Sequence, residues 1–250
     1  MDLIERRTDA PHRHPWETAR VEAIRSIVAR LPLERPRVLE LGCGDAFVLG
    51  ALQRSFSFSE SLAYDLHMTE ELARALAESL PEVHFMRSLQ ELGDKKADLV
   101  LLLDVLEHIE NPVDYLRRVV TERLSAEAWI VVTVPAFQSL FSEHDRRLRH
   151  FRRYSRAEIA DVMKDAGFEV SDSGYLFASL LAPRALALLG EKIFTPRPDD
   201  GPGVGGWHGS PFLTRALHRA LCWDNAVSLA AHRQGLDLPG LSTWVTCRKS

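Results

Sequence analysis

Short apolar runs alternate with segments of helical apolar spacing along the first two thirds of the chain. Uninterrupted apolar runs are typical of strands buried in a parallel sheet, and strands that alternate with helices predict an α/β domain. The predicted strands are Val38–Leu41, Ser61–Leu66, Val83–Met86, a run that begins at Ala97, and Trp129–Pro135. The predicted helices cover about 47–55, 69–80 and 112–124. This order predicts a doubly wound sheet with helices on both faces.

The two ends of the chain add further elements. A helical pattern begins at Pro15 and ends at Pro32, because proline is favoured in the first turn of a helix and disruptive inside it. We expect residues 1–33 to form a tail followed by this helix. The remaining predicted elements are a helix over Arg156–Ala166 before Gly167, a strand that begins at Phe168, and a last strand over Leu241–Arg248.

The segment 176–240 separates the last two strands and is far longer than a usual hairpin loop. Its first part, Leu176–Leu189, is apolar but broken by Pro183, and it is too short to span a membrane. A proline- and glycine-rich stretch over 195–211 follows, and then a predicted helix near 212–233. We expect the segment to form a lid over an apolar acceptor pocket. The alternatives are a surface loop without a catalytic role and a contact with a lipid interface.

The most informative motif joins the first strand to the next helix. Gly42 and Gly44 follow an apolar strand, and glycines at such a turn let the backbone approach a ligand closely. A dinucleotide site requires a third glycine where this chain has Phe47, so an NAD-dependent oxidoreductase is disfavoured. Asp65, roughly 20 residues further on, stands where a doubly wound fold places a carboxylate for ribose hydroxyls.

The sequence Glu40-x-Gly42-x-Gly44 resembles motif I of class I S-adenosylmethionine-dependent methyltransferases, with Ala46 at the family's usual third glycine. The segment Ala97–Ile109 is similar to the family's fourth strand and its D-x-L-E-H continuation. The resemblance implies one methyltransferase domain over residues 1–250, with S-adenosylmethionine as cofactor. It further implies a Rossmann-like α/β fold whose seven-stranded, mostly parallel sheet has the order 3-2-1-4-5-7-6, with helices on both faces and a helical insertion before the last strand.

The same resemblance implies a set of cofactor-binding residues. They are Glu40, Gly42, Cys43, Gly44, Asp65, Leu66, Ser88, Leu89, Asp104, Val105 and His108. Asp65 would hold the ribose and Asp104 would lie near the methionine moiety. Related enzymes often read adenine with an acidic residue after the third strand, where this chain offers only Ser88 and Gln90. The helix that begins at Pro15 would cover the cofactor.

Candidate catalytic residues follow the fifth strand. The pattern V-P-A, then H-D, then H-x-R-R-Y resembles a subset of class I enzymes linked to sugar, lipid or secondary-metabolite pathways. That subset also carries the turn Pro239-Gly240-Leu241-Ser242 before its last strand. A histidine beside a carboxylate can act as an oriented base for a hydroxyl. We therefore expect His144 with Asp145 to be the first choice, His150 the second, and His108 to line the same pocket.

The same segment supplies candidate substrate contacts. The guanidinium group recognises carboxylates and phosphates in a bidentate manner, and aromatic side chains supply an apolar wall. The predicted contacts are Arg152, Arg153, Tyr154 and, from the insertion, Trp207. The alternative is that these arginines only pair with carboxylates and anchor the loop.

A metal is not expected, although one pattern favours it. Asp104-x-x-Glu107-His108 resembles the metal-binding Glu-x-x-Glu-His of small-RNA 2′-O-methyltransferases. His144 would supply a further ligand in that case. The first position here is Asp rather than Glu, and the motif also occurs in methyltransferases without a metal.

Composition narrows the function further. The 250 residues carry a net charge of −4, which disfavours a nucleic-acid partner. Three cysteines without metal-site spacing and a charged N-terminus without a signal sequence predict a cytoplasmic protein. We expect a methyltransferase that acts on a small molecule, at a hydroxyl, and we assign no oligomeric state. The alternatives are a metal-dependent RNA 2′-O-methyltransferase and a non-catalytic partner subunit with the methyltransferase fold.

Overall fold

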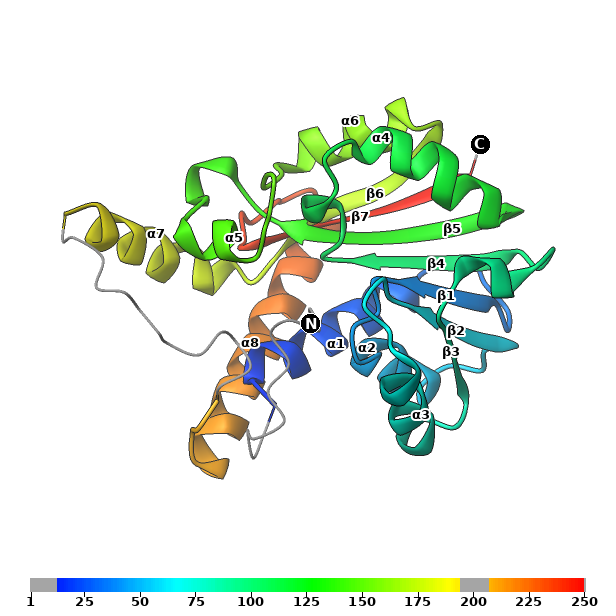
Figure 1. The fold of residues 1–250 in the computed structure, drawn as a ribbon. Helices are drawn as coiled ribbons and strands as arrows, with labels where there is room; N and C mark the ends of the chain where they lie inside the picture. Colours follow the sequence, from blue (N-terminus) through cyan, green and yellow to red (C-terminus); the bar gives the residue numbers. More distant parts are fainter. Residues whose placement is uncertain (1–12, 194–206, 250) are drawn as a thin grey trace.

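The computed structural model describes residues 13–193 and 207–249. One seven-stranded sheet runs through this part of the chain in the order β3-β2-β1-β4-β5-β7-β6 (Figure 1). The strands are β1 (Arg37–Leu41), β2 (Glu60–Tyr64), β3 (Val83–Met86), β4 (Ala97–Leu103), β5 (Leu124–Pro135), β6 (Phe168–Leu176) and β7 (Ser242–Lys249). Strands β1 to β5 are parallel, and β7 is antiparallel to both β5 and β6. The predicted fold class and strand order are confirmed.

Helices cover both faces of the sheet (Figure 1). They are α1 (Pro15–Val28), α2 (Phe47–Gln53), α3 (Glu70–Ser79), α4 (Pro112–Tyr115), α5 (Glu143–Arg147), α6 (Arg156–Asp165), α7 (Ala178–Ile193) and α8 (Pro211–Arg233). The apolar side chains of β4 pack on both faces of the sheet, because successive side chains of a strand point to opposite sides. Leu99 and Leu101 pack in the core with α1, α2 and α8, while Val100 and Leu102 pack with α6.

One predicted helix differs from the structure. The expected helix over 112–124 is α4 followed by a π-helical turn, Leu116–Val120, and a 3₁₀ turn, Thr121–Arg123. The apolar segment that Pro183 interrupts in the sequence forms the helix α7, with Pro183 inside it. Pro183 is the sixth residue of this helix, so the helix lacks the N–H that would donate to the Ser179 carbonyl one turn earlier.

The insertion contributes two helices, and α8 lies alongside α1 (Figure 1). Thr18 of α1 and His218 of α8 are joined by a hydrogen bond of 2.8 Å between Oγ1 and Nδ1. The buried Asn225 side chain accepts a hydrogen bond of 2.8 Å from the backbone N–H of Phe177, where β6 ends. Most of the proline- and glycine-rich stretch predicted over 195–211 lies outside the described residues. Among the described helices, none is both long enough and apolar enough to cross a membrane.

Candidate functional site

The turn after β1 is held by a carboxylate of the neighbouring strand. The N–H of Gly44 donates to Asp65 Oδ2 at 2.9 Å, and the N–H of His67 donates to Asp65 Oδ1 at 2.9 Å. Gly42, Gly44 and Ala46 all have positive φ, at 73°, 55° and 53°. A Cβ at Gly42 would lie 2.6 Å from Val105 Cγ2, so glycine is required there. The structure thus brings the predicted β1 turn, Asp65 and Val105 together.

A narrow pocket lies between this turn and α1. Its lining residues are Arg13, Glu17, Arg20, Glu40, Gly42, Cys43, Phe47, Val48 and Leu103. The Oε2 atoms of Glu17 and Glu40 are buried, and neither has a hydrogen-bond partner among the described residues. Burial raises the pKa of Glu40 to about 8 and also raises the pKa of Glu17. The pocket therefore holds acceptor oxygens that lack a donor.

A charged contact ties α1 to the ends of β4 and β5. Arg20 forms an ion pair of 2.9 Å with Asp104, and it also donates to Thr133 Oγ1 at 3.2 Å. Thr133 in turn donates to Asp104 Oδ1 at 3.0 Å. Asp104 has a φ of 58°, so its backbone turns sharply after β4. This contact orients Asp104 towards the pocket side of α1.

Sequence reasoning missed the polar residues of α1. Glu17 and Arg20 are only 6% and 5% exposed, although both belong to residue types that are rarely buried without a partner. Their positions on the otherwise apolar face of α1, beside Val21 and Ile24, were the one available signal. Arg13 extends the same surface, since it pairs with Asp45 and lies over the Phe47 ring.

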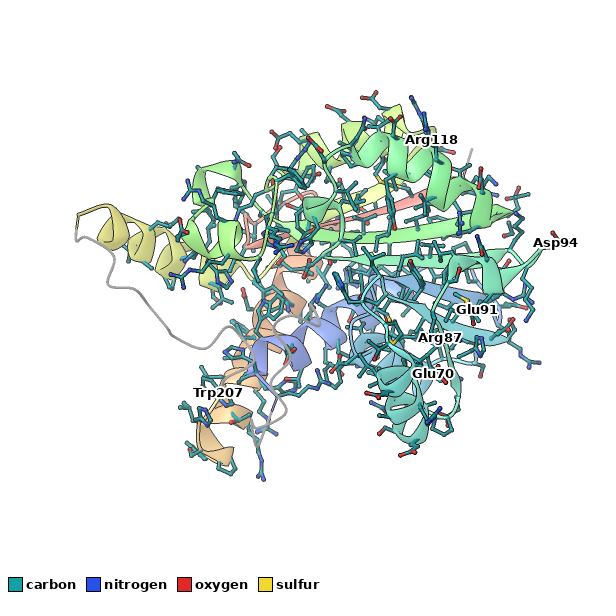
Figure 2. The ribbon with its side chains drawn as sticks, viewed as in Figure 1. Glu70, Arg87, Glu91, Asp94, Arg118 and Trp207 are labelled. Atoms are coloured by element: carbon teal, nitrogen blue, oxygen red, sulfur yellow. The ribbon has the colours of Figure 1, made fainter. Side chains whose placement is uncertain are left out.

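The predicted adenine-side residues lie at the ends of β2 and β3. Leu66 is 79% exposed directly after Asp65, an apolar surface without a cover in this part of the chain. Ser88 caps its own turn by accepting from the N–H of Gln90 at 3.2 Å. The charged groups of Glu70, Arg87 and Glu91 gather beside this edge, with Arg87 and Glu70 3.2 Å apart (Figure 2).

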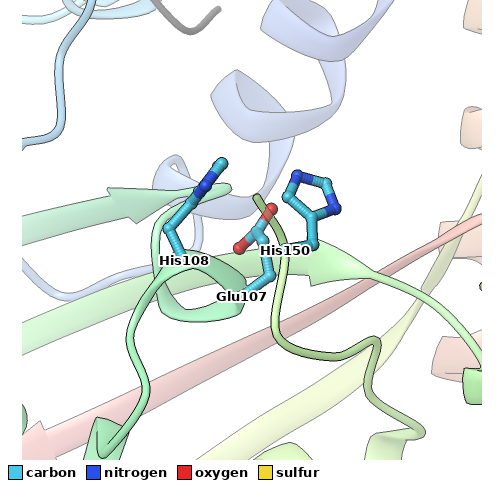
Figure 3. Close-up of side chains that lie close together, drawn as sticks. All are labelled: Glu107, His108 and His150. Atoms are coloured by element: carbon cyan, nitrogen blue, oxygen red, sulfur yellow. The ribbon is translucent and has the colours of Figure 1, made fainter. Parts of the chain in front are cut away.

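A cluster of Glu107, His108 and His150 lies where the loops after β4 and β5 meet (Figure 3). One ligand-type atom from each side chain lies within 4.8 Å of those from the other two. The rings of His108 and His150 meet edge to face with centroids 4.6 Å apart. A backbone hydrogen bond of 2.8 Å from Phe151 N–H to the Glu107 carbonyl joins the two loops. Burial and the nearby Asp104 raise the pKa of Glu107 well above its ordinary value.

Asp145 orients one histidine of this cluster. His150 Nδ1 lies 3.0 Å from Asp145 Oδ1, and Arg153 donates to both carboxylate oxygens at 2.8 and 3.1 Å. Burial acts to raise the pKa of Asp145, but the hydrogen bonds from His150 and Arg153 hold it well below its usual range. An ionised Asp145 fixes the proton of His150 on Nδ1 and leaves Nε2 as the acceptor atom.

The pairing of His144 with Asp145, expected from their adjacency, is not the one in the structure. Asp145 is the third residue of the short helix α5 and completes a capping box with Ser142, which turns its carboxylate towards His150. His144 is exposed at the surface, and the partial desolvation of its ring lowers its pKa. It stays a candidate base on this ground, without the orienting carboxylate that was expected.

The four predicted substrate contacts differ in their surroundings. Arg153 and Tyr154 are buried and hold the loop, since Tyr154 donates to the Leu106 carbonyl at 3.1 Å. Arg152 donates to the Glu110 carbonyl at 2.6 Å. Trp207 lies beside α8 (Figure 2), where it donates to Thr214 Oγ1 at 2.7 Å and contacts the His14 ring. Substrate contact by these residues stays a prediction.

The fold, the glycine turn and Asp65 together define a class I S-adenosylmethionine-dependent methyltransferase. A sequence profile described as a methyltransferase domain matches residues 16–173, which is more than half of the chain. The chain belongs to this methyltransferase domain family, and its cofactor is S-adenosylmethionine. A comparison with curated proteins gives no match.

Solved structures share the fold at low sequence identity. A SAM-dependent methyltransferase from Archaeoglobus fulgidus is 18% identical, with a TM-score of 0.53, over 93% of this chain and 94% of that one. The plantazolicin methyltransferase BamL, in complex with a triazolic desmethylPZN analog and SAH, is 15% identical with a TM-score of 0.55, over 94% and 85%. A complex between the Haloferax volcanii Trm112 methyltransferase activator and a candidate methyltransferase gives 16% identity and a TM-score of 0.54, over 93% and 94%.

Proposed function

We propose that the chain transfers a methyl group from S-adenosylmethionine to a hydroxyl of a small molecule. The observation that carries this proposal is the oriented His150 in the cluster with Glu107 and His108, at the strand ends beside the cofactor turn. An acceptor hydroxyl has a high pKa, so its proton must leave as the methyl group arrives. An imidazole with a free Nε2 is suited to this task.

The residues of the pocket match the groups of the cofactor. The ribose diol is a pair of donors, and Asp65 uses only part of its acceptor capacity on two backbone N–H groups. The amino-acid end is a zwitterion, and the pocket offers the unpartnered oxygens of Glu17 and Glu40 to its ammonium group. Arg20 lines the same pocket and is suited to its carboxylate. When bound, the cofactor supplies a methyl group already activated on a positively charged sulfur.

The chain's own contribution to the reaction is positioning and the exclusion of water. Helix α1 closes one side of the pocket, and its Arg20 is anchored on Asp104 and Thr133. The loop after β5 closes the acceptor side, where Asp145 holds His150 in one orientation. In the absence of another activating group, Nε2 of His150 takes the proton of the acceptor hydroxyl.

We propose that the insertion over 176–240 forms one wall of the acceptor site. Arg184 of α7 donates to Ser142 Oγ, directly before the short helix that carries Asp145. Phe137 after β5 stacks on Tyr175 of β6 with ring centroids 5.2 Å apart. The acceptor then lies between the histidine cluster and α7. We assign it to sugar, lipid or secondary-metabolite pathways. The complex of BamL with a triazolic desmethylPZN analog and SAH supports an organic acceptor. The free thiols of Cys43, Cys222 and Cys247 accord with a cytoplasmic location.

Calorimetric titration with S-adenosylhomocysteine tests the cofactor half of the proposal. The wild-type chain should bind one equivalent, and Asp65→Ala should weaken binding by at least about tenfold, since it removes a charged hydrogen-bond acceptor. His84→Ala, on the exposed face of β3, is the matched control and should bind like the wild type. Equal binding by Asp65→Ala would contradict the site.

The acceptor half needs a transfer assay. Labelled S-adenosylmethionine is incubated with sets of hydroxylated, amino and thiol small molecules, and the labelled products are identified by mass spectrometry. The proposal expects the label on oxygen. Transfer only to nitrogen, sulfur or carbon acceptors, or only to RNA, would overturn the assignment of the hydroxyl.

A further inference from the structure

We infer that Glu107, His108 and His150 form a binding site for a divalent transition-metal ion, and that Zn²⁺ matches it best. The inference rests on the proposed function, because the ion would activate the acceptor hydroxyl in the same cluster. Two imidazoles and one carboxylate are a ligand set of catalytic zinc sites, which keep a further position open for water or substrate. The cluster provides this set with His150 in place of the Asp104 and His144 considered from sequence.

The spacing of the three side chains suits one ion. One ligand atom from each lies within 4.8 Å of those from the other two. Ligands about 2.0–2.2 Å from a zinc ion lie roughly 3.5 Å from one another in a tetrahedral site. Side-chain rotations that move the ligand atoms by about an ångström would close this difference. The backbone is already fixed, because Phe151 N–H donates to the Glu107 carbonyl and Tyr154 to the Leu106 carbonyl.

The carboxylate of Glu107 gives independent support. Glu107 is 1% exposed, and its Oε2 has no hydrogen-bond partner among the residues that the structure describes. A buried carboxylate oxygen without a donor is costly, so a group that satisfies it is expected. Figure 3 shows this carboxylate between the His108 and His150 rings. A cation at this place would complete the coordination of an oxygen that the chain leaves unpaired.

His150 also has the support that metal-binding histidines usually have. Such a histidine donates its second ring N–H to a carboxylate, which fixes the ring and makes the ligating nitrogen more basic. Asp145 takes this position at 3.0 Å from Nδ1 of His150. Asp145 is itself fully buried and held by Arg153 and Ser142, so the orientation of the ring is set before any ion arrives.

The nearby arginines do not pair with Glu107. Arg20 is paired with Asp104, and Arg153 is paired with Asp145. Each of these guanidinium groups already has a carboxylate partner, and Glu107 is left without an ion pair among the described residues. A divalent cation is the partner that this balance favours.

A bound ion would change how the hydroxyl is activated. The acceptor oxygen would take the open position, and its O–H bond would break at a lowered pKa, with the proton passing to water. The same oxygen lone pair would form the bond to the methyl carbon, while the carbon–sulfur bond breaks and its electron pair stays on sulfur. His150 would then act as a ligand through Nε2 rather than as the base.

Titration of chelator-treated protein with Zn²⁺ alone tests the site directly. The wild-type chain should bind one ion at this cluster with micromolar or tighter affinity. His150→Gln and His108→Gln should each weaken binding by at least about tenfold, and Asp145→Asn by about 10- to 100-fold.

The matched controls are His144→Gln, next to Asp145, and His218→Gln, beside Cys222 on α8. Both should bind Zn²⁺ like the wild type, because neither side chain belongs to the cluster. A Co²⁺ titration followed by visible absorption gives a second readout, and its d–d bands should be lost in His150→Gln. Circular dichroism checks that each variant is folded.

The outcomes separate the ion from the proposed reaction. Stoichiometric binding lost in the cluster variants and kept in both controls supports the inference. Equal Zn²⁺ binding in wild type and His150→Gln, or methyl transfer that is unchanged after chelation with no ion bound, overturns it and leaves the proposed hydroxyl transfer intact. Absence of transfer to any hydroxyl acceptor, with the Zn²⁺ site intact, contradicts the proposed function instead.

Discussion

The cofactor side of the site is assembled from two adjacent strand ends, whereas the acceptor side joins loops that lie far apart in sequence. Gly44 and Asp65 meet because β1 and β2 are neighbours in a parallel sheet. On the other side, Tyr154 reaches the Leu106 carbonyl across 48 positions, and Arg184 reaches Ser142 across 42. Backbone geometry therefore sets the first region, and long-range side-chain contacts set the second.

We therefore expect substitutions on the acceptor side to affect methyl transfer without affecting cofactor binding. His150→Ala should lower kcat for methyl transfer by about 10²–10⁴, because it removes the group that activates the hydroxyl. Its affinity for S-adenosylmethionine should stay within about threefold of the wild type, since no cofactor contact is lost. Steady-state kinetics with calorimetry measure both quantities. A loss of cofactor affinity as large as the loss of kcat would merge the two regions into one.

The contact between α1 and the strand ends links the two regions. Arg20→Ala leaves Asp104 partly buried without its cation, which should lower the free energy of unfolding by roughly 2 kcal/mol. It should also weaken S-adenosylmethionine binding. Arg25→Ala, which breaks an exposed pair with Glu22 on the same helix, is the control and should change stability by less than about 0.5 kcal/mol. Equal stability of Arg20→Ala and Arg25→Ala in urea unfolding would contradict this role of Arg20.

His232, which lies outside the candidate site, gives α8 a pH-dependent contact. His232 lies 2.6 Å from both Asp172 and Asp237. Burial acts to lower its pKa, but the hydrogen bonds and charges of the two aspartates raise it above 6.5 overall. The charged form is thus favoured in the folded state, so this stabilisation is fully present below pH 6.5 and is lost as pH rises through the folded pKa.

The measurement is the melting temperature as a function of pH for the wild type and His232→Gln. The difference between the two should be largest near pH 6 and shrink towards pH 9. Because Trp244 contacts the His232 ring edge to face, its fluorescence reports the same titration. A difference that grows with pH would reverse the assigned sign.

The smallest predicted effect concerns Ala46, at the family's usual third glycine. Its φ of 53° is strained for a residue with a Cβ, so Ala46→Gly should stabilise the chain by up to about 1 kcal/mol. Ala51→Gly, inside α2, is the matched control and should destabilise it by roughly 0.5–1 kcal/mol. Thermal unfolding that shows the same sign for both would contradict the strain at Ala46.

The sequence predicts the fold and the meeting of the glycine turn with Asp65, for a physical reason. Strand periodicity and the glycine turn are local signals, and parallel strands bring their carboxyl ends to one edge without further information. The partners of Arg20 depend on how α1 docks, which no local pattern encodes. The preference of Asp145 for His150 over His144 depends on the capping box with Ser142 and on Arg153. Adjacency in sequence gave the wrong partner because a helical turn points neighbouring side chains in different directions.

The most direct test is a crystal structure of the chain with S-adenosylhomocysteine bound. We expect the ribose on Asp65, the amino-acid end between α1 and the β1 turn, and the sulfur facing His150 across a space for one acceptor. A ligand bound away from Asp65, or a sulfur turned away from the Glu107, His108 and His150 cluster, would contradict this arrangement of the site.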